Sequence, residues 1–265
     1  MWQRRRIAAY GVCRDESGRV LLTGAGDLPG GRVEHGQHPR DAAVRGFAAR
    51  TGLDVEIVAL RDLVARFTIE TDEIVHTDQV RYAVKVTGGA PRGDLTWADA
   101  LPVPEEPPLP ASRPRRDPRA TRMQRFAAYG LTTDPAGRLL LTRIAAPYPG
   151  AGTWHLPGGG TDFGEQPTEG LLRELVEETG QLGRVIGLRA VSQYHNPRAL
   201  GPEGRPMDWH TVRALYRVVI DDPGTPRVLE ETGGSTAEAR WVTRADLPKL
   251  PLNGFAKTAI AHHLS

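Results

Sequence analysis

Cysteine and lysine are almost absent from the 265 residues: Cys13 is the only cysteine, and three of the 34 basic residues are lysines. A single cysteine excludes an intrachain disulfide, and we expect Cys13 to be a small buried residue on a strand of a cytoplasmic protein. No apolar run approaches the roughly 20 residues that a transmembrane helix needs, so no membrane partner is expected. The net charge is only +2 and the basic residues are scattered, so no nucleic-acid partner is expected either.

One sequence pattern occurs twice along the chain. AAYG at 8–11 returns at 127–130 with an offset of 119, and LPGG at 28–31 returns at 156–159 with an offset of 128. The nine extra residues of the second copy fall in the Gly- and Pro-rich stretch 144–152, which predicts a surface loop. The repeat predicts two homologous domains.

A proline-rich stretch, LPVPEEPPLPASRPRRDP at 101–118, separates the two copies. Its proline density is incompatible with a helix interior and favours an extended, semi-rigid chain. It predicts a linker between a domain at 1–100 and a domain at 119–265, although its xPxxP spacing would also suit binding of a partner domain. Within each copy, strands surround the LPGG turn and one helix, so the predicted class is α+β.

The stretch 156–182 of the second copy carries the candidate chemistry. Pro167 suits a first helical turn and Gly180 suits a left-handed C-terminal cap, so a helix is predicted over 167–179. At 100° per residue, Glu174, Glu177 and Glu178 would occupy an arc of about 100° beside an apolar stripe. Like charges four residues apart destabilise an isolated helix by roughly 0.2–0.5 kcal/mol, so a partner must favour them.

Two interpretations of these glutamates are open. Clustered carboxylates without cysteine or closely spaced histidines suit Mg²⁺ or Mn²⁺ rather than zinc, and Mg²⁺ usually joins carboxylates to substrate phosphates. The glycines Gly158–Gly160 would let the backbone approach such a site closely. The alternative is an acidic helix face that is solvated or paired with Arg173.

The spacing of these residues resembles the signature of the Nudix hydrolases, G-x5-E-x7-R-E-U-x-E-E-x-G-U, where U is apolar. The matching positions are Gly159, Glu165, Arg173, Glu174, Leu175, Glu177, Glu178 and Gly180. The last position departs from the pattern, because Gln181 stands where an apolar residue is expected and Leu182 follows it. The resemblance covers the second copy from about 122 to its end.

The resemblance implies two Nudix folds, each an α/β/α sandwich around a mixed β-sheet, and hydrolysis of a nucleoside diphosphate linked to another group. It implies that Glu174, Glu177, Glu178 and the Gly158 carbonyl hold Mg²⁺ or Mn²⁺, and that Glu174 also orients or deprotonates water. Such cations neutralise a diphosphate and activate water for attack on phosphorus.

The resemblance also implies supporting residues and one further acidic ligand. Glu165 and Arg173 would position the glutamates. The further ligand would come from a later loop, where Glu230, Glu231 and Glu238 are available, and we assign it to Glu238.

The first copy keeps the scaffold of the signature but none of its glutamates. The aligned residues are Gly31, Gln37, Arg45, Gly46, Phe47, Ala49, Arg50, Gly52 and Leu53. We therefore expect a non-catalytic Nudix-like domain. The retained scaffold favours a role in packing against the second copy, as an intrachain pseudo-dimer; ligand binding and regulation are the alternatives.

The substrate is expected to be a small-molecule diphosphate, and the sequence indicates its identity only weakly. Tyr194 and Trp209, with His195 and His210 beside them, flank an insertion and are candidates to stack on a base, although core packing would also explain them. Asn253 is a candidate to read a base or, alternatively, the N-cap of the last helix. Trp154 is expected in the core.

Alternatives remain for the substrate and for catalysis itself. The substrate is expected to be a nucleoside triphosphate, a nucleotide sugar or an ADP-ribose-like compound, and a prenyl diphosphate is the alternative. A tandem module that senses a ligand without turnover is the alternative from another functional class.

Overall fold

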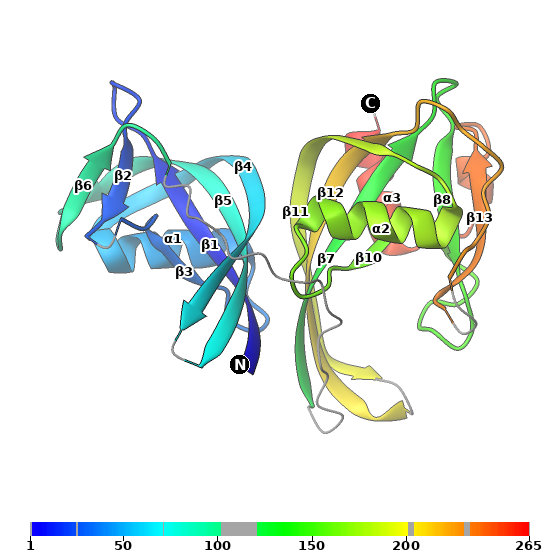
Figure 1. Cartoon of the computed structure of the whole chain (residues 1–265), viewed down its shortest axis with the longest axis horizontal. Coiled ribbons are helices and arrows are strands. Elements are labelled where there is room, and N and C mark those ends of the chain that lie inside the picture. The colour runs from blue at the N-terminus through cyan, green and yellow to red at the C-terminus, as the bar shows by residue number, and fades with distance from the viewer. Residues whose placement is uncertain are drawn as a thin grey trace. The chain divides into compact units, whose positions relative to one another are not determined.

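The computed structural model describes residues 2–24, 26–70, 72–101, 121–200, 204–230 and 234–264 (Figure 1). The chain divides into two compact units. The first comprises 1–126 together with 162–164 and 191–212, and the second comprises 127–161, 165–190 and 213–265. All but one residue of the expected linker at 101–118 lies outside the described residues.

The first unit contains a four-stranded mixed sheet in the order β3-β1-β5-β4. Its strands are β1 (Trp2–Cys13), β3 (Gly30–Arg32), β4 (Leu53–Glu70) and β5 (Glu73–Gly89). β1 runs parallel to β5, whereas the other pairs are antiparallel. Two short strands, β2 (Val20–Thr23) and β6 (Leu95–Ala98), pair separately. The helix α1 (Pro39–Thr51) also belongs to this unit and buries its Phe47. Cys13 is buried on β1, as expected.

The second sheet has the order β11-β12-β7-β8-β13, with β10 on β7 and β9 on β8. Its strands are β7 (Arg122–Thr133), β8 (Leu139–Ile144), β9 (Trp154–His155), β10 (Gly158–Gly160), β11 (Arg184–Leu200), β12 (Pro206–Val219) and β13 (Thr236–Val242). The helices are α2 (Pro167–Thr179), the 3-10 turn η2 (Leu247–Lys249) and α3 (Gly254–His263). The predicted α+β class is therefore confirmed.

Local sequence signals explain the ends of α2. The helix spans Pro167–Thr179, as predicted, with Pro167 in the first turn, and it ends at Gly180 in the left-handed region at φ 67°. Glycine adopts that conformation without a Cβ penalty. At the other end, the Glu169 carboxylate accepts a hydrogen bond from the Gln166 N–H at 2.9 Å, which satisfies one of the free donors of the first turn.

The core of the second unit fixes the strand that precedes the site. Trp154 is 3% exposed and packs with Leu131, Leu141 and Leu156, which confirms its expected place in the core. The predicted loop at 144–152 is exposed over its last seven residues. Among the described residues, no helix is both long and apolar enough to cross a membrane.

Candidate metal site and its comparison with known proteins

Three glutamates converge beside the helix α2 in the second unit. Glu174 and Glu178 lie on α2, and Glu230 lies in the segment before β13. Carboxylate oxygens of the three residues lie within 4.8 Å of one another. The sequence had indicated convergence on the helix, and the structure adds Glu230 from a segment more than fifty residues away.

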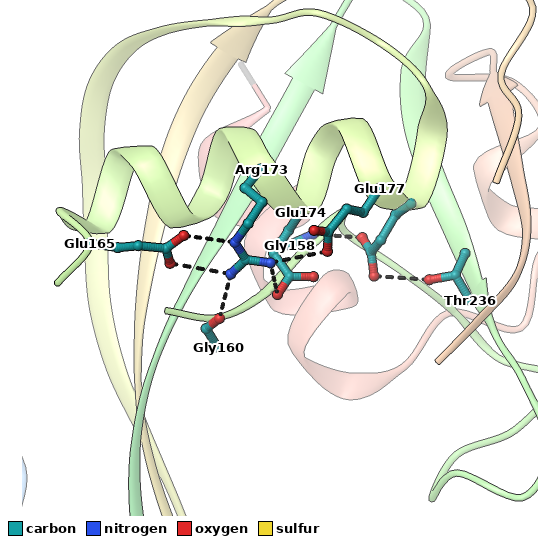
Figure 2. Close-up of polar contacts among 8 residues, drawn as sticks. Gly158, Gly160, Glu165, Arg173, Glu174, Glu177 and Thr236 are labelled. Atoms are coloured by element: carbon teal, nitrogen blue, oxygen red, sulfur yellow. Dashed lines mark hydrogen bonds and ion pairs between the residues drawn. The ribbon is translucent and has the colours of Figure 1, made fainter. Parts of the chain in front are cut away.

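Glu178 is the most deeply placed of these carboxylates, at 1% exposed. Its two oxygens accept hydrogen bonds from the Gly158 N–H at 2.8 Å and from the Thr236 hydroxyl at 2.9 Å (Figure 2). Burial raises the pKa of Glu178 well above its ordinary value, and the charges of Glu174 and Glu230 act in the same direction. The two hydrogen bonds lower the pKa but do not outweigh burial.

This arrangement fits a divalent cation. A buried carboxylate beside two other carboxylates is unfavourable while all three are ionised, and a cation bound by their oxygens removes that repulsion. Oxygen donors without nitrogen or sulfur suit Mg²⁺ or Mn²⁺. The described residues of the cluster, Glu174, Glu178 and Glu230, therefore have the donor chemistry that the sequence predicts.

Arg173 holds the neighbouring carboxylates in place (Figure 2). Its guanidinium donates to Glu165 at 2.7 and 3.2 Å, to Glu174 at 3.1 Å, to Glu177 at 3.0 Å and to the Gly160 carbonyl at 3.1 Å. Burial alone would lower the pKa of Arg173, but the hydrogen bond to Glu165 and the charges of the carboxylates raise it above its ordinary value. Arg173 therefore stays charged and links β10 to α2.

Glu177 is more exposed than its neighbours, with 38% of its side chain accessible, and it pairs with Arg173. The alternative interpretation of the acidic face, pairing with Arg173, thus accounts for Glu177 and for part of Glu174 in the structure. It does not account for the buried Glu178, whose hydrogen bonds come from Gly158 and Thr236 instead.

Glycine is needed where β10 passes the helix. A Cβ atom at position 159 would lie 2.8 Å from the carboxyl carbon of Glu174, so the glutamate side chain would have to move, and one at position 158 would meet the Ala128 backbone. Gly158 has φ 126°, a conformation that residues with side chains rarely adopt. The expectation that these glycines bring the backbone close to the glutamates agrees with both observations.

The structure does not bring Glu238, which we had assigned as the late acidic ligand, into the glutamate cluster. Its carboxylate instead pairs with Arg143 at 3.1 Å and Arg240 at 2.8 Å, and the hydrogen bond from Arg240 lowers its pKa. A bulge in the β13–β8 pairing lies between Thr236 and Glu238, so the strict alternation of side chains is interrupted there. Glu231 lies outside the described residues.

The three residues expected to bind substrate, Tyr194, Trp209 and Asn253, lie on different elements of the fold. Tyr194 is 44% exposed on β11, and the Trp209 indole donates to the Thr211 hydroxyl on β12. Both belong to the first unit, whereas the glutamates belong to the second. The Asn253 side chain accepts from the Ala256 N–H at 2.8 Å, which confirms the alternative that Asn253 is the N-cap of α3.

The first copy preserves the arginine contacts of the second, but no carboxylate takes part in them. Arg45 donates to the Gln37 side chain and to the Arg32 carbonyl, both at 3.0 Å. These three positions correspond to Arg173, Glu165 and Gly160 in the second copy. The scaffold interaction therefore persists when the carboxylate has become an amide.

The position that corresponds to Glu174 is closed in the first copy. Gly46 aligns with Glu174, and a Cβ atom at position 46 would lie 2.4 Å from the Gly30 carbonyl carbon and 2.6 Å from the Gly31 nitrogen. The helix α1 approaches β3 so closely that no side chain fits between them. The absence of a glutamate here is thus a feature of the packing as well as of the sequence.

The model of the Nudix domain matches the chain twice, over residues 4–105 and 123–263. The chain belongs to the Nudix family. Both matches together cover most of its length, and the resemblance found in the signature is confirmed as a tandem Nudix arrangement. This tandem Nudix protein thus carries one copy with the glutamates and one without them.

Similar proteins share only part of their length with the chain. An RNA pyrophosphohydrolase of Brucella abortus is 34% identical over 110 residues, which cover 37% of this chain and 58% of that protein. An RNA pyrophosphohydrolase of Psychrobacter arcticus is 30% identical over 100 residues, covering 36% and 58%. The crystal structure of a MutT Nudix hydrolase from Burkholderia pseudomallei is 27% identical, covers 53% of this chain and 98% of that one, and has a TM-score of 0.42. The chain thus spans somewhat more than half the length of the curated relatives it matches.

Proposed function

We propose that the second Nudix copy is a metal-dependent hydrolase that cleaves a diphosphate bond of a nucleoside diphosphate linked to another group. The observation that carries this proposal is the cluster of Glu174, Glu178 and Glu230, one member of which is buried. Membership of the Nudix family supports it, as do relatives that are named pyrophosphohydrolases.

The metal would be held by Glu174, Glu178 and Glu230, with Glu177 and the Gly158 carbonyl as further candidate ligands. We place Glu230 in the position that we first assigned to Glu238, because Glu230 lies in the cluster and Glu238 is held by two arginines. Bound Mg²⁺ or Mn²⁺ would supply neutralisation of the diphosphate and acidification of water.

The chain's own residues would position these groups. Glu174, 15% exposed in its side chain, is the candidate to orient a water or take its proton. Arg173 would keep Glu174 in place by donating to its carboxylate, and Glu165 would hold Arg173 by accepting from its guanidinium. Gly159 would keep the space over the Glu174 carboxylate free of a side chain.

Tyr194, Trp209 and Asn253 remain candidate substrate-binding residues by proposal alone. The Asn253 side-chain oxygen already caps α3, so recognition of a base by this residue would have to use its amide nitrogen. A prenyl diphosphate is the alternative substrate, and the proposed intrachain pseudo-dimer and cytoplasmic location also rest on the sequence.

The experiment is a screen of the purified chain with Mg²⁺ or Mn²⁺ against diphosphate compounds, with phosphate release read before and after added phosphatase. The panel includes nucleoside triphosphates, nucleotide sugars, ADP-ribose, RNA with a terminal triphosphate, and prenyl diphosphates. Release from a nucleotide or RNA supports the proposal. Release from prenyl diphosphates alone supports the alternative substrate, and release from none supports a ligand-sensing module.

A further inference from the structure

A second group of metal-ligating side chains lies in the first unit, apart from the glutamates. His35 follows β3, His195 lies on β11 and Asp208 lies on β12. Their ligand atoms are within 4.8 Å of one another. The Asp208 Oδ1 atom lies 2.7 Å from His195 Nε2 and 2.9 Å from His35 Nε2, so two imidazoles converge on one carboxylate oxygen.

The carboxylate oxygen satisfies only one of the two imidazoles. His195 Nε2 forms a hydrogen bond with Oδ1. His35 Nε2 is close enough but outside the angular range of a hydrogen bond, and this buried nitrogen has no hydrogen-bond partner among the residues that the structure describes. A buried polar atom with a poorly aligned partner is costly, and a further group at the point where the three side chains meet would satisfy it.

The neighbouring side chains orient the group as supporting residues do around a metal. Arg122 Nε lies 3.3 Å from the other oxygen of Asp208, Oδ2, so Oδ1 remains turned toward the histidines. Behind them, the buried His210 ring lies with its centroid 5.3 Å from that of His35. His210 Nδ1 is engaged by the Gln124 amide at 3.0 Å, so His210 packs against the group without joining it.

Solvent has a route to this group. His35 and Arg122 line a cavity of about 350 Å³ together with three further arginines of the first unit, Arg5, Arg6 and Arg32. Arg5 is paired with Asp78 at 2.8 Å and Arg122 with Asp208, so part of the positive charge around the cavity is neutralised. Of the three proposed ligands, His35 lines this cavity, so solvent can approach the group from the side of His35.

We propose that His35, His195 and Asp208 form a second metal site, which binds a Zn²⁺-like cation and is chemically distinct from the glutamate cluster. Two imidazoles and one carboxylate are ligands that zinc, cobalt and nickel accept readily, whereas an all-carboxylate site suits Mg²⁺. Three protein ligands leave at least one coordination position for water or a small anion. The site requires no activity of the second copy, and it joins His35 to two residues that lie 160 or more positions further along the sequence.

The test is a titration of the full chain, without an affinity tag, with Co²⁺ in saturating Mg²⁺. Mg²⁺ occupies the carboxylate sites, so the visible absorption of Co²⁺ reports nitrogen-containing sites. We expect one Co²⁺ per chain. The affinity should fall at least about 10-fold in the His195→Ala and Asp208→Asn variants, the size of effect typical of a lost metal-site residue. Zn²⁺ should displace the Co²⁺.

The matched control is His262→Ala, which removes a histidine whose ring lies 6.3 Å from that of His263 on α3, away from the proposed ligands. This variant should bind Co²⁺ as the unmodified chain does. In a second measurement, Zn²⁺ should raise the melting temperature of the unmodified chain and not that of His195→Ala. Equal Co²⁺ affinity in the unmodified chain and His195→Ala, no Co²⁺ binding in Mg²⁺, or loss of binding only in His262→Ala would each overturn the proposal.

Discussion

Replacing Glu178 by glutamine should raise the stability of the metal-free chain and lower its hydrolytic activity. The carboxylate is 1% exposed and shares the cluster with Glu174 and Glu230. Two charges 4.8 Å apart, the outer limit within the cluster, repel by about 3 kcal/mol at an effective dielectric constant of about 20. Glutamine removes this repulsion and can still accept from the Gly158 N–H while donating to the Thr236 hydroxyl oxygen.

Without metal, Glu178→Gln should therefore be more stable than the unmodified chain at neutral and alkaline pH. We expect a gain of about 1–3 kcal/mol, or roughly 5 °C in melting temperature for a chain of this size. With Mg²⁺ the order should reverse, because the unmodified chain gains about 4.1 kcal/mol at a metal concentration of roughly 1,000 times the dissociation constant. Hydrolysis should fall by at least about 100-fold, since a metal ligand is lost.

The effect should also depend on pH with a definite sign. Burial raises the pKa of Glu178 in the folded chain, so the folded state holds its proton more tightly than the unfolded state does. The stabilisation by this proton is fully present below the unfolded pKa of about 4.3 and is lost as the pH rises through the raised folded pKa. The stability advantage of Glu178→Gln should therefore be small at pH 4 and grow with pH.

The assay is differential scanning calorimetry of the full chain in EDTA and in Mg²⁺ between pH 4 and pH 9. Glu177→Gln is the control, because Glu177 is 38% exposed and paired with Arg173, so its loss should bring no pH-dependent gain in stability. Hydrolysis should nevertheless fall in this variant as well. A difference between Glu178→Gln and the unmodified chain that stays constant from pH 4 to pH 9 in EDTA would refute the reasoning.

Three further predictions concern the division of roles along the chain. Glu230→Gln should lower hydrolysis at least about 10-fold and Glu238→Gln less than about 2-fold, because only Glu230 lies in the cluster; equal losses in steady-state assays would contradict this. Gly46→Ala should destabilise the first unit by about 1–3 kcal/mol in denaturant titration, because its Cβ would meet the Gly30 backbone, and unchanged stability would refute that packing. The fragment 119–265 should retain metal-dependent hydrolysis but melt below the full chain, because its residues 191–212 belong to the first unit; hydrolysis by residues 1–100 alone would contradict the assignment.

The helix that carries the glutamates was predictable because its ends depend on local signals. Pro167 and Gly180 act through their own backbone preferences, whatever the rest of the chain does. The apolar and acidic positions between them follow from the helical period alone. The choice of Glu230 over Glu238 was not predictable, because it depends on the bulge beside Thr236 and on the two arginines that face Glu238 across and along the strand.

The histidine group could not be predicted for a related reason. His195 was noticed only as the neighbour of Tyr194, and nothing in its local sequence indicates His35 or Asp208. The three meet only because β11 and β12 contribute residues 191–212 to the first unit. Long-range juxtaposition of single residues carries no periodicity, so spacing rules that identify a metal site within one helix do not detect it.

The two copies together indicate which interactions belong to the scaffold and which belong to the chemistry. The arginine that joins the helix to the strand after LPGG survives in both copies, as Arg173 and Arg45, and its acceptor is a carboxylate in one and an amide in the other. The arginine contact therefore forms with a charged or with a neutral acceptor. A buried carboxylate corresponding to Glu178 is costly without a cation, and in the first copy an exposed arginine, Arg50, takes its place. Once the glutamates are gone, the helix can close on the strand at Gly46, and this closure removes the room that a restored carboxylate would need.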